Sequence, residues 1–429
     1  MIIGRGGFKD ANERIETIRR ARASGLNVMT FRGVENADLD ATGRLLREVD
    51  VLSMLNREQY EPDENVLAGV VAHKRILVTG GAGSIGSQLA QRCLMLGAAQ
   101  VVIADRSEAG VFHWLKNLPE ALKKNADARL VDVASESGMT RVFREFKPDI
   151  VFHAAALKHV PLVEANWASA ITTNILGTWI CAQLAQKFQA QRFVFISTDK
   201  AVEPTTFLGL TKRFGELICG AMNQHPQTGQ ADGGKNTRFT SVRFGNVFGT
   251  EGSVVNVFEE QIKAGGALTI THPEMRRYFM TANEASSLVI LSTAIDTQDA
   301  ATSSRIYVLE MGEQIKIIDI ARAMIRLAGK NPDVDVEIKI TGVRQFEKLE
   351  EKLVADDEPI AKTNNNNILI TRCPQIDLAS MKKYVETLVA IAISGDFIEA
   401  LEIISAAQAS GNARDATGKV IALNPKRGI

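Results

Sequence analysis

Arg75-Ile-Leu-Val-Thr-Gly-Gly-Ala-Gly-Ser-Ile-Gly86 joins a short apolar run to a glycine-rich turn. The apolar, β-branched start of this stretch predicts a buried strand, and the periodic residues Ile85–Leu96 predict a helix behind it. Gly80 allows a tight turn, Gly83 lets backbone N–H groups approach a pyrophosphate, and Gly86 allows the helix to pack closely on the strand. Such a strand–loop–helix unit is typical of a site for the phosphates of a dinucleotide.

After this unit, short β-branched runs alternate with stretches of helical periodicity. The predicted strands are Arg75–Thr79, Val101–Ala104, Ala128–Val131, Ile150–His153 and Phe193–Ser197, and helices are predicted at Ile85–Leu96, Gly138–Phe146 and Ile171–Phe188. Apolar strands separated by helices predict a parallel sheet that is covered on both faces. The expected fold class is therefore α/β, a doubly wound Rossmann-type parallel sheet with a smaller C-terminal α/β part.

Charge and cysteine usage exclude several classes of protein. The 429 residues carry 50 Lys+Arg and 50 Asp+Glu, and this balance argues against a nucleic-acid partner. Four scattered cysteines are typical of a reducing compartment. The six histidines form no HExxH or His/Cys cluster, so we expect no metal. The longest apolar stretches fall short of the roughly 18 residues that a membrane span needs, which predicts a cytoplasmic protein without such a span.

Acidic residues after the second and third strands extend the cofactor hypothesis. Asp105 follows the glycines at the spacing at which a carboxylate binds the ribose hydroxyls of NAD. Arg106 beside it leaves NADP open, because an arginine there can receive a 2′-phosphate. Asp132 has two open interpretations, a contact to the adenine amino group or a cap for the following helix.

Several motifs in order carry a family resemblance. They are Thr79–Ser87, Asp105, His153–Pro161, Ser197–Lys200, Gly209–Lys212, Arg243–Gly249, Thr269–Met280 and Thr341–Lys348. Together they resemble the extended short-chain dehydrogenase/reductases, and within them the nucleotide-sugar dehydratases of polysaccharide biosynthesis, typified by UDP-N-acetylglucosamine 4,6-dehydratase. Gly43–Asp50 is similar to the linker that precedes the catalytic domain in long, membrane-anchored members.

The resemblance implies a reaction and its catalytic residues. Hydride transfer from C4 of the sugar to the nicotinamide would be followed by loss of water across C5 and C6 and return of hydride to C6. The implied catalytic residues are Thr198, Asp199, Lys200 and Lys212. Lys200 would take the C5 proton, Asp199 would protonate the leaving hydroxyl, and Lys212 would bind the nicotinamide ribose. Leu208 stands where the superfamily usually has tyrosine, so another group must accept the C4 proton.

The remaining candidate residues are binding residues. Those expected at the cofactor are Gly80, Gly83, Ser84, Ile85, Gly86, Asp105, Arg106, Asp132, Val133, Ala154, Ala155, Ala156 and Lys212; those expected at the sugar nucleotide are Lys158, His159, Asn174, Asn246, Arg277, Arg344 and Glu347. For His159 a loop-stabilising role is open, for Asn174 a backbone kink or a cap, and for each arginine a solvated surface charge. The family's Arg-Pro-Gly-Glu-Lys is Arg-Gln-Phe-Glu-Lys at residues 344–348, which departs from the expected loop geometry.

These expectations divide the chain into four parts. Residues 1–72 form an N-terminal extension or linker, 73–250 an NAD-binding Rossmann domain, 251–375 a mainly substrate-binding part, and 376–429 a C-terminal helical extension. Further helices are predicted at Lys316–Leu327, Leu378–Ser394 and Ile398–Ala409, and a turn at Asn364–Asn367. A basic helical pattern at Asn12–Ser24 carries no recognisable chemistry, and the tail around Pro425 is expected to fray.

Two other functions stay open beside the dehydratase. A UDP-sugar 4-epimerase on the same fold oxidises and re-reduces C4, but it has no need of an acid–base pair acting at C5 and C6. A non-catalytic NAD(P)-binding regulator is suggested by Leu208 and by the altered loop at Arg344. In each case the expected partners are a UDP-sugar and further copies of this chain.

Overall fold

The computed structural model describes residues 2–3, 29–30, 51, 60, 62–223, 237–295 and 305–410. Two compact units divide these residues. The larger unit comprises 62–244, 285–310 and the described part of 352–429; the smaller comprises 245–284, 311–351 and the described residues before 62. The patterns noted at Asn12–Ser24, Gly43–Asp50 and around Pro425 lie outside the described residues. The functional division into four parts stays a prediction.

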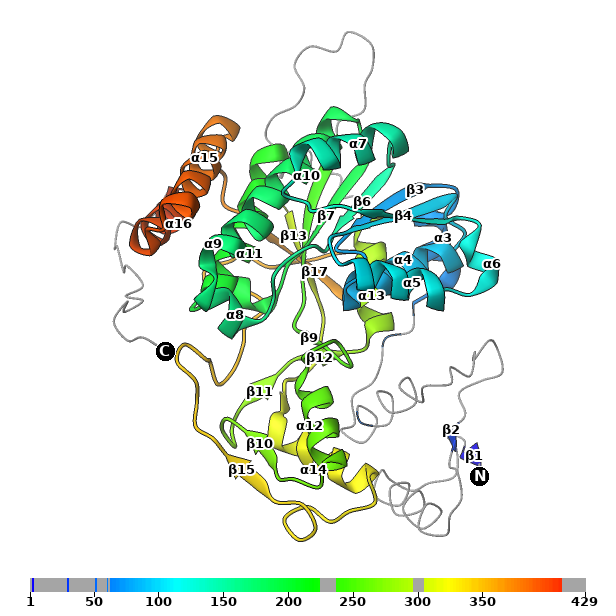
Figure 1. Ribbon diagram of the computed structural model, residues 1–429, viewed down its shortest axis with the longest axis vertical. Helices are drawn as coiled ribbons and strands as arrows, with labels where there is room; N and C mark the ends of the chain where they lie inside the picture. The colour runs from blue at the N-terminus through cyan, green and yellow to red at the C-terminus, as the bar shows by residue number, and fades with distance from the viewer. Residues whose placement is uncertain are drawn as a thin grey trace. The chain divides into compact units, whose positions relative to one another are not determined.

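The larger unit is built on one large sheet (Figure 1). In the described part of the chain its strand order is β16-β17-β13-β8-β7-β6-β3-β4-β5. The bounds are β3 Arg75–Thr79, β4 Gln100–Asp105, β5 Ala126–Leu130, β6 Ile150–His153, β7 Arg192–Ile196, β8 Arg238–Arg243, β13 Arg305–Leu309, β16 Ala361–Lys362 and β17 Ile368–Arg372. From β13 to β5 all neighbours pair in parallel. The predicted doubly wound parallel sheet is confirmed.

Four strands of this sheet, β8, β13, β16 and β17, were not among the strands predicted from the sequence. β13 pairs in parallel with β8, β17 pairs antiparallel with β13, and β16 pairs antiparallel with β17. The residues of the last three lie in a range expected to be mainly substrate-binding, because local periodicity does not report a partner that is distant along the chain. The turn expected at Asn364–Asn367 connects β16 and β17.

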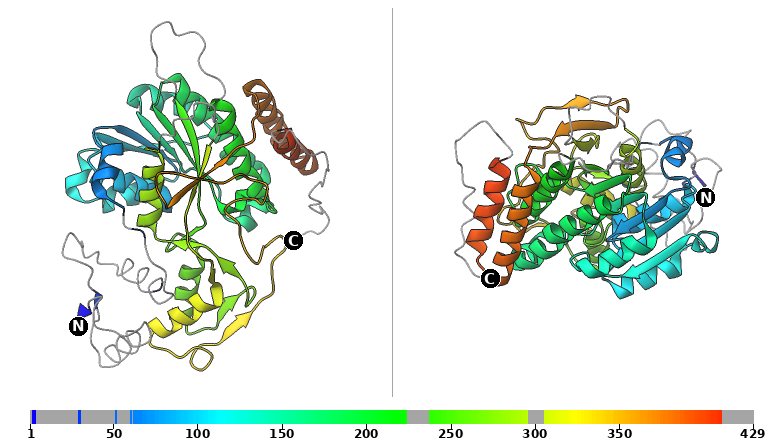
Figure 2. Two further views of the ribbon diagram at one scale, coloured as in Figure 1. Left: turned by 180° about the vertical axis from the view of Figure 1, so that it is seen from behind. Right: turned by 90° about the horizontal axis from the view of Figure 1, so that it is seen from above.

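Helices lie on both sides of the sheet (Figure 2). α4 (Ser84–Met95) packs on β3 and β4, whereas α10 (Gly177–Lys187) packs on β6 and β7 and α11 (Phe207–Asn223) on β7 and β8. The other helices of this part are α3 Glu64–Val71, α5 Glu108–Asn117, α6 Glu120–Lys123, α7 Glu136–Phe146, α8 Val160–Ala165, α9 Trp167–Ala170 and α13 Ala282–Ser292. The helices predicted at 85–96 and 138–146 are confirmed.

The helix predicted at 171–188 divides into two parts. Ile171–Leu176 is one stretch of π-helix, η1, and α10 continues from Gly177. A π-helical stretch inserts one extra residue into the helical repeat and is frequent at functional sites. Asn174 lies within this stretch, whose π-helical geometry the sequence pattern alone does not show.

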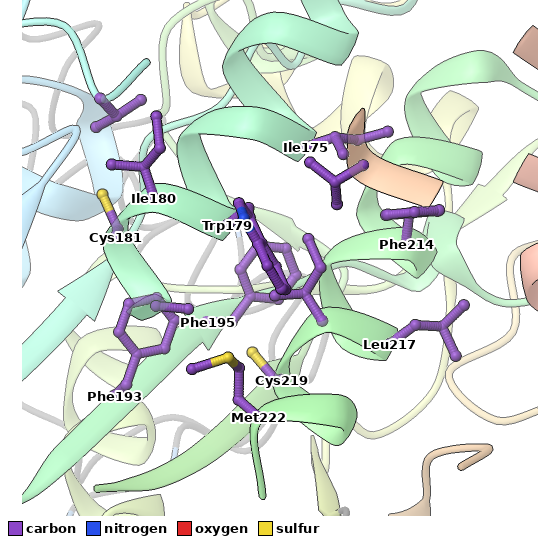
Figure 3. Packing of buried hydrophobic residues seen from close by; sticks show 14 of the residues in the cluster. Ile175, Trp179, Ile180, Cys181, Phe193, Phe195, Phe214, Leu217, Cys219 and Met222 are labelled. Atoms are coloured by element: carbon purple, nitrogen blue, oxygen red, sulfur yellow. The ribbon is translucent and has the colours of Figure 1, made fainter. Parts of the chain in front are cut away.

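A single apolar cluster joins the sheet to α10 and α11 (Figure 3). Trp179 from α10 lies near the centre of the view, among Phe195 from β7 and Phe214 and Leu217 from α11. Gly215 of α11 packs directly on the Phe195 ring, since a Cβ atom at this glycine would lie 2.3 Å from the ring's Cζ atom. The backbone of α11 therefore approaches the sheet closely at this point.

The C-terminal helices α15 (Leu378–Ser394) and α16 (Phe397–Ser410) form a pair outside α11 (Figures 1 and 2). The two helices predicted there are confirmed. Met381, Val385 and Leu388 point from α15 into the same cluster as α11. The pair therefore extends the core of the larger unit.

The smaller unit has short strands around two helices. Its described elements between residues 245 and 351 are β9 Asn246–Val247, α12 Val254–Lys263, β10 Leu268–Ile270, β11 Arg276–Arg277, β12 Phe279–Met280, β14 Ile315–Lys316, α14 Ile317–Leu327 and β15 Ile338–Ile340. Earlier in the chain, β1 Ile2–Ile3 pairs in parallel with β2 Met29–Thr30. Phe248, Phe258 and Phe279 lie in its own apolar cluster together with residues of α14. The helix predicted at 316–327 is confirmed.

Replacing Gly215 with alanine should destabilise the protein. The new methyl group would overlap the Phe195 ring, and overpacking of this kind costs about 1–3 kcal/mol. Gly69 in α3 is the matched control, because a Cβ atom there meets nothing within 4 Å. Thermal denaturation should show a lower Tm for Gly215→Ala and an unchanged or higher Tm for Gly69→Ala, since alanine favours helix over glycine. Equal Tm values would contradict the packing described.

Candidate active site

The glycine-rich turn leaves no space for side chains between its backbone segments. Gly80 has φ +64°, and a Cβ atom there would lie 2.5 Å from the backbone nitrogen of Ala155. A Cβ atom on Gly86 would lie 2.2 Å from the carbonyl oxygen of Gly80. Gly83 is the N-cap of α4 and makes no side-chain hydrogen bond to the helix. The first turn of α4, at Ser84 and Ile85, therefore has its N-terminal end directly at the glycine-rich turn. This geometry fits the phosphates of a dinucleotide.

Asp105 closes the turn from the neighbouring strand. Its Oδ2 accepts a hydrogen bond from the Ala82 N–H at 3.0 Å, and its Oδ1 accepts one from the Ser107 N–H at 2.9 Å. The carboxylate therefore lies beside the glycine-rich turn at the end of β4. This is the position from which a ribose hydroxyl would be bound, as the sequence predicts.

Arg106 and Asp132 lie close together. The Arg106 Nη1 atom is 3.6 Å from Oδ2 of Asp132, and the Asp132 Oδ1 atom accepts the Ala134 N–H at 2.9 Å. The helix cap that was one interpretation of Asp132 is made by another residue: Ser135 accepts the Gly138 N–H at the start of α7. Asp132 instead closes a turn before the helix and faces an arginine.

Small residues follow β6 and lie against the turn. The Ala154 N–H donates to the Thr79 carbonyl at 3.0 Å, and Ala155 is the residue that a side chain at Gly80 would strike. Val133 has a different environment, because its side chain is buried in the core against Gly177. Any contact of Val133 with a cofactor would therefore involve its backbone.

Ser197–Lys200 follows β7 directly and carries the predicted acid–base pair. Asp199 is fully buried, and its Oδ1 accepts hydrogen bonds from the Thr198 hydroxyl at 2.8 Å and from Lys200 Nζ at 3.0 Å. Its Oδ2 is also buried and has no hydrogen-bond partner among the residues that the structure describes. A protonated Asp199 would carry its proton on Oδ2, because Oδ1 already accepts two hydrogen bonds.

Lys212 lies on α11, beside the last residue of β7. Its Nζ donates to the carbonyl oxygen of Ile196 and lies 4.2 Å from the centroid of the Phe195 ring. Burial lowers the pKa of this ammonium group to about 8, although the nearby Glu216 carboxylate opposes the shift. Leu208, one turn earlier, is 5% exposed and belongs to the apolar cluster. It therefore supplies no proton-transferring group.

His153 lies at the end of β6 and is fully buried. Its ring nitrogens are 2.7 Å from Thr79 Oγ1 and 2.9 Å from Thr178 Oγ1. Burial first, and then the charge of Lys212, lower the pKa of His153 to about 3. The imidazole is therefore neutral at physiological pH and joins β3 to α10.

Asn174 holds the loop after β6, which agrees with the open interpretation as a cap, and its contact with substrate stays a prediction. Its side chain is 1% exposed, accepts the Leu157 N–H at 2.8 Å, and donates to the Leu157 carbonyl at 3.1 Å and to Thr211 Oγ1 at 3.0 Å. All of its bonding capacity points inward, toward the loop after β6. Lys158 and His159 on that loop are exposed, so they stay candidates for substrate contact.

In the smaller unit, Arg277 is buried. The alternative that it is a solvated surface charge is therefore wrong. Arg277 is 8% exposed and donates to the carbonyl oxygens of Lys348 at 2.9 Å and Leu349 at 3.1 Å. The Glu347 carboxylate lies 3.8 Å from its Nη2. Arg277 therefore holds the chain around residue 348, and a contact to a diphosphate stays a prediction.

The altered loop at 344–347 keeps a closed turn. The Glu347 N–H donates to the Arg344 carbonyl, and the Glu347 carboxylate accepts the Arg344 N–H, both at 3.1 Å. Phe346, at the position of the family's glycine, has φ +65°, which is a conformation that favours glycine. Arg344 is exposed and Asn246 is half-buried in β9 of the same unit.

Two carboxylates at this site were not found from the sequence. Glu164 of α8 accepts the Phe207 N–H at the start of α11 at 2.7 Å, and burial raises the pKa of its carboxyl group. Glu216 of α11 accepts the Ser197 hydroxyl at 2.7 Å. Neither residue is part of a motif, and the pairing of residues far apart in the chain leaves no local signal.

Within 62–223, 237–295 and 305–410, no group of three or more His, Cys, Asp or Glu side chains is arranged to hold a metal ion. Of the helices in these ranges, none combines the length and the apolar character that a membrane crossing requires.

The fold and the glycine-rich turn define the chain as a Rossmann-type protein of the extended short-chain dehydrogenase/reductase class. The chain belongs to the family of polysaccharide biosynthesis proteins, which it matches over residues 76–373. The family expected from the sequence is confirmed. Among solved structures, Pen from Bacillus thuringiensis is 28% identical and superposes with a TM-score of 0.62 over 72% of this chain and 92% of that one.

Curated relatives with assigned names are also similar. The capsular polysaccharide biosynthesis protein CapD of Staphylococcus aureus is 38% identical over 80% of this chain, which spans 57% of that relative's length. A UDP-N-acetylglucosamine 4,6-dehydratase (inverting) of Campylobacter jejuni is 30% identical over 66% of this chain and 78% of its own length. A UDP-glucose 4-epimerase of Rickettsia rickettsii is 30% identical over 76% of this chain and 90% of its own length.

Replacing Gly86 with alanine should abolish cofactor retention. The added methyl group would lie 2.2 Å from the Gly80 carbonyl oxygen, so the turn that faces the phosphates would have to move. We expect the nicotinamide dinucleotide content of the purified protein to fall at least about tenfold, since a displaced phosphate site loses several hydrogen bonds. Extraction of the protein followed by chromatography measures this content. Unchanged content in Gly86→Ala would contradict the assignment of the turn.

Stability should depend on the ionisation of Lys212. Its pKa is lowered to about 8 in the folded protein from about 10.5, so the unfolded chain binds more protons between these pH values. The free energy of unfolding of the natural protein, relative to Lys212→Met, should therefore rise as pH increases from about 8 to about 10.5. Urea denaturation across this range measures the difference. A difference that does not change with pH would contradict the buried, partly deprotonated lysine.

Proposed function

We propose that the protein is a nucleotide-sugar 4,6-dehydratase with NAD bound in its larger unit. It would convert UDP-N-acetylglucosamine, or another UDP-N-acetylhexosamine, to the 4-keto-6-deoxy product for a bacterial surface polysaccharide or glycan. The observation that carries the proposal is the buried Asp199 paired with Lys200 at the end of β7, with one carboxylate oxygen that has no hydrogen-bond partner in the described part of the chain. The names of the capsular and dehydratase relatives support it.

Adjacent strands of one sheet supply the parts of this site. β7, β6 and β3 are neighbours in parallel, so the Ser197–Lys200 segment, the alanines after β6 and the glycine-rich turn lie along the same edge. Ligands of open parallel sheets bind at this edge. When bound there, NAD supplies the hydride acceptor and donor for C4 and C6 of the sugar.

The residues around the cofactor have separate tasks. Asp105 would bind the adenine ribose, and the Arg106–Asp132 pair favours NAD because Asp132 already engages the arginine that a 2′-phosphate would need. Lys212 would hold the nicotinamide ribose with its buried amine. Because Leu208 has no exchangeable proton, the C4 proton would pass through the Thr198 hydroxyl to the Asp199 carboxylate, which accepts a hydrogen bond from that hydroxyl.

The acid–base pair would act on the ketone. A carbonyl group at C4 acidifies the C5 proton, and Lys200 in its amine form would remove it. Asp199 would donate the proton on Oδ2 to the departing C6 hydroxyl, which leaves as water. When hydride returns to C6, the Lys200 ammonium group would give a proton back to C5. General acid–base steps contribute about 10²–10⁴-fold each. The exposed fraction of the Lys200 side chain, 25%, leaves it accessible to a substrate beside the fully buried Asp199.

A UDP-sugar 4-epimerase is the second candidate, favoured by the length over which the chain matches the Rickettsia epimerase. Incubation of the purified protein with UDP-N-acetylglucosamine in deuterated water separates the two. Loss of one water, a new 6-methyl signal in the NMR spectrum and deuterium at C5 support the dehydratase. Conversion to the galacto epimer at unchanged mass contradicts it, and no reaction with any UDP-sugar leaves a cofactor-binding regulator.

Lys200→Met and Asp199→Asn should each lower dehydratase kcat by about 10²–10⁴-fold, because each removes one proton-transfer group. Lys382→Met is the matched control for the lysine, since Lys382 lies on α15 in an exposed pair with Glu386. The control should retain the kcat of the natural protein in the same NMR assay. Full activity in Lys200→Met would remove Lys200 from the mechanism.

A further inference from the structure

A buried group of four charges lies directly behind the catalytic segment of the larger unit. Arg243, at the end of β8, is fully buried and donates to Glu216 Oε1 at 2.6 Å and Oε2 at 2.8 Å. It also donates to Glu358 Oε2 at 2.6 Å and Oε1 at 2.9 Å. Arg213 joins both carboxylates at 2.9 Å. We name these four residues the buried charge cluster.

This cluster is connected to Ser197, the first residue of the catalytic segment. The Ser197 hydroxyl donates to Glu216 Oε1 at 2.7 Å, so the side chain points toward the cluster. The Ser197 N–H donates to the Val242 carbonyl at 2.8 Å, and the Asp199 N–H donates to the Phe244 carbonyl at 3.1 Å. The backbone of the segment is therefore bound to the residues on either side of Arg243. The Ser197 side chain is bound to Glu216, the carboxylate partner of Arg243.

The cluster also holds a distant part of the chain. Arg243 donates to the Leu353 carbonyl at 3.3 Å, and Glu358 accepts the Ala355 N–H at 3.1 Å. Residues 353–358 thus form a turn that is closed on the cluster. This turn precedes β16, and it places the second carboxylate opposite Glu216 across the Arg243 guanidinium group.

Charge balance makes the cluster rigid. Burial alone would raise the pKa of Glu216, but the charges and hydrogen bonds of Arg243, then Arg213, together with the Ser197 hydroxyl, lower it. Two guanidinium groups face two carboxylates, and each arginine–carboxylate contact is charge-assisted. Removal of one partner leaves a buried charge without compensation, which is strongly unfavourable. Glu216 therefore has one stable position, and this position determines that of Ser197.

We propose that Glu216, held by Arg243 and Glu358, is a positioning residue that acts through Ser197 to place Thr198, Asp199 and Lys200 for proton transfer. The inference rests on the proposed function for its catalytic consequence. It assigns a role to Glu216 and Glu358, which lie outside the motifs that point to the cofactor or the sugar. It also explains the direction of the Ser197 side chain, which points toward the cluster.

Ser197→Ala tests the proposal with the least disturbance, because it removes one hydroxyl and leaves all four charges paired. We expect kcat to fall about 10- to 100-fold, since small misplacements of reacting groups cost up to about that much. KM for the sugar nucleotide and the bound NAD content should stay unchanged, as the cofactor and nucleotide contacts are intact. Hydrogen–deuterium exchange at residues 198–203 of the holoprotein should become roughly five- to tenfold faster with one hydrogen bond lost.

The matched control is Ser292→Ala in α13. Ser292 is equally buried and donates to the Val289 carbonyl at 2.7 Å, but it has no connection to the cluster. This variant should lower Tm to a similar extent and leave kcat and the exchange of residues 198–203 unchanged. Glu358→Gln, which acts from the far side of Arg243, should repeat the effect of Ser197→Ala on both readouts.

Unchanged kcat and unchanged exchange in Ser197→Ala would overturn the proposal, as would equal effects in Ser292→Ala. If the natural protein turns over no sugar nucleotide, the proposed function fails. The exchange measurement still decides whether the cluster holds the segment, because it needs no substrate.

Discussion

Parallel pairing of β7, β6 and β3 is the constraint on which the candidate site depends. Because these strands run in one direction, the segments that follow them emerge at a common edge of the sheet. Their backbones approach so closely that side chains are excluded at Gly80, where Ala155 lies in the way, and at Gly86, where Gly80 does. Close approach of backbone groups is what allows main-chain N–H groups to bind phosphates.

Buried polar groups connect the strands at this edge to the neighbouring helices. His153 joins β3 to α10 in its neutral form, and Lys212 donates to the end of β7 with a lowered pKa. The buried charge cluster around Arg243 joins α11, β8 and the turn before β16. Polar groups in the interior are costly unless they are fully paired, so such groups specify a single arrangement of the segments that they join.

Local sequence patterns predicted much of the sheet and helices but not their distant partners. The strands at 75–79 and 150–153 and the helix at 378–394 have the predicted bounds, because their apolar periodicity and flanking turns are local signals. The return of β13 to the sheet and the partners of Glu216 depend on contacts between residues far apart in the sequence. Such contacts leave no periodic trace in a single chain.

The candidate site residues also divide into those that a local signal predicts and those that depend on distant contacts. The glycine-rich turn, Asp105 and the Asp199–Lys200 pair are adjacent to strand ends, and the structure places them at one edge. The substrate contacts of Asn174 and Arg277 stay predictions, and the structure shows both side chains buried and hydrogen-bonded to backbone carbonyls. Residue type suggested their chemistry, whereas only the packing shows where each side chain points.

The mass of the sugar nucleotide after reaction tests the central claim most directly. Purified protein with its bound NAD would be incubated with UDP-N-acetylglucosamine and the product analysed by mass spectrometry. We predict a product lighter by one water, with no net consumption of NAD. An epimer of unchanged mass, or no reaction with any UDP-N-acetylhexosamine, would contradict the dehydratase function assigned to Asp199 and Lys200.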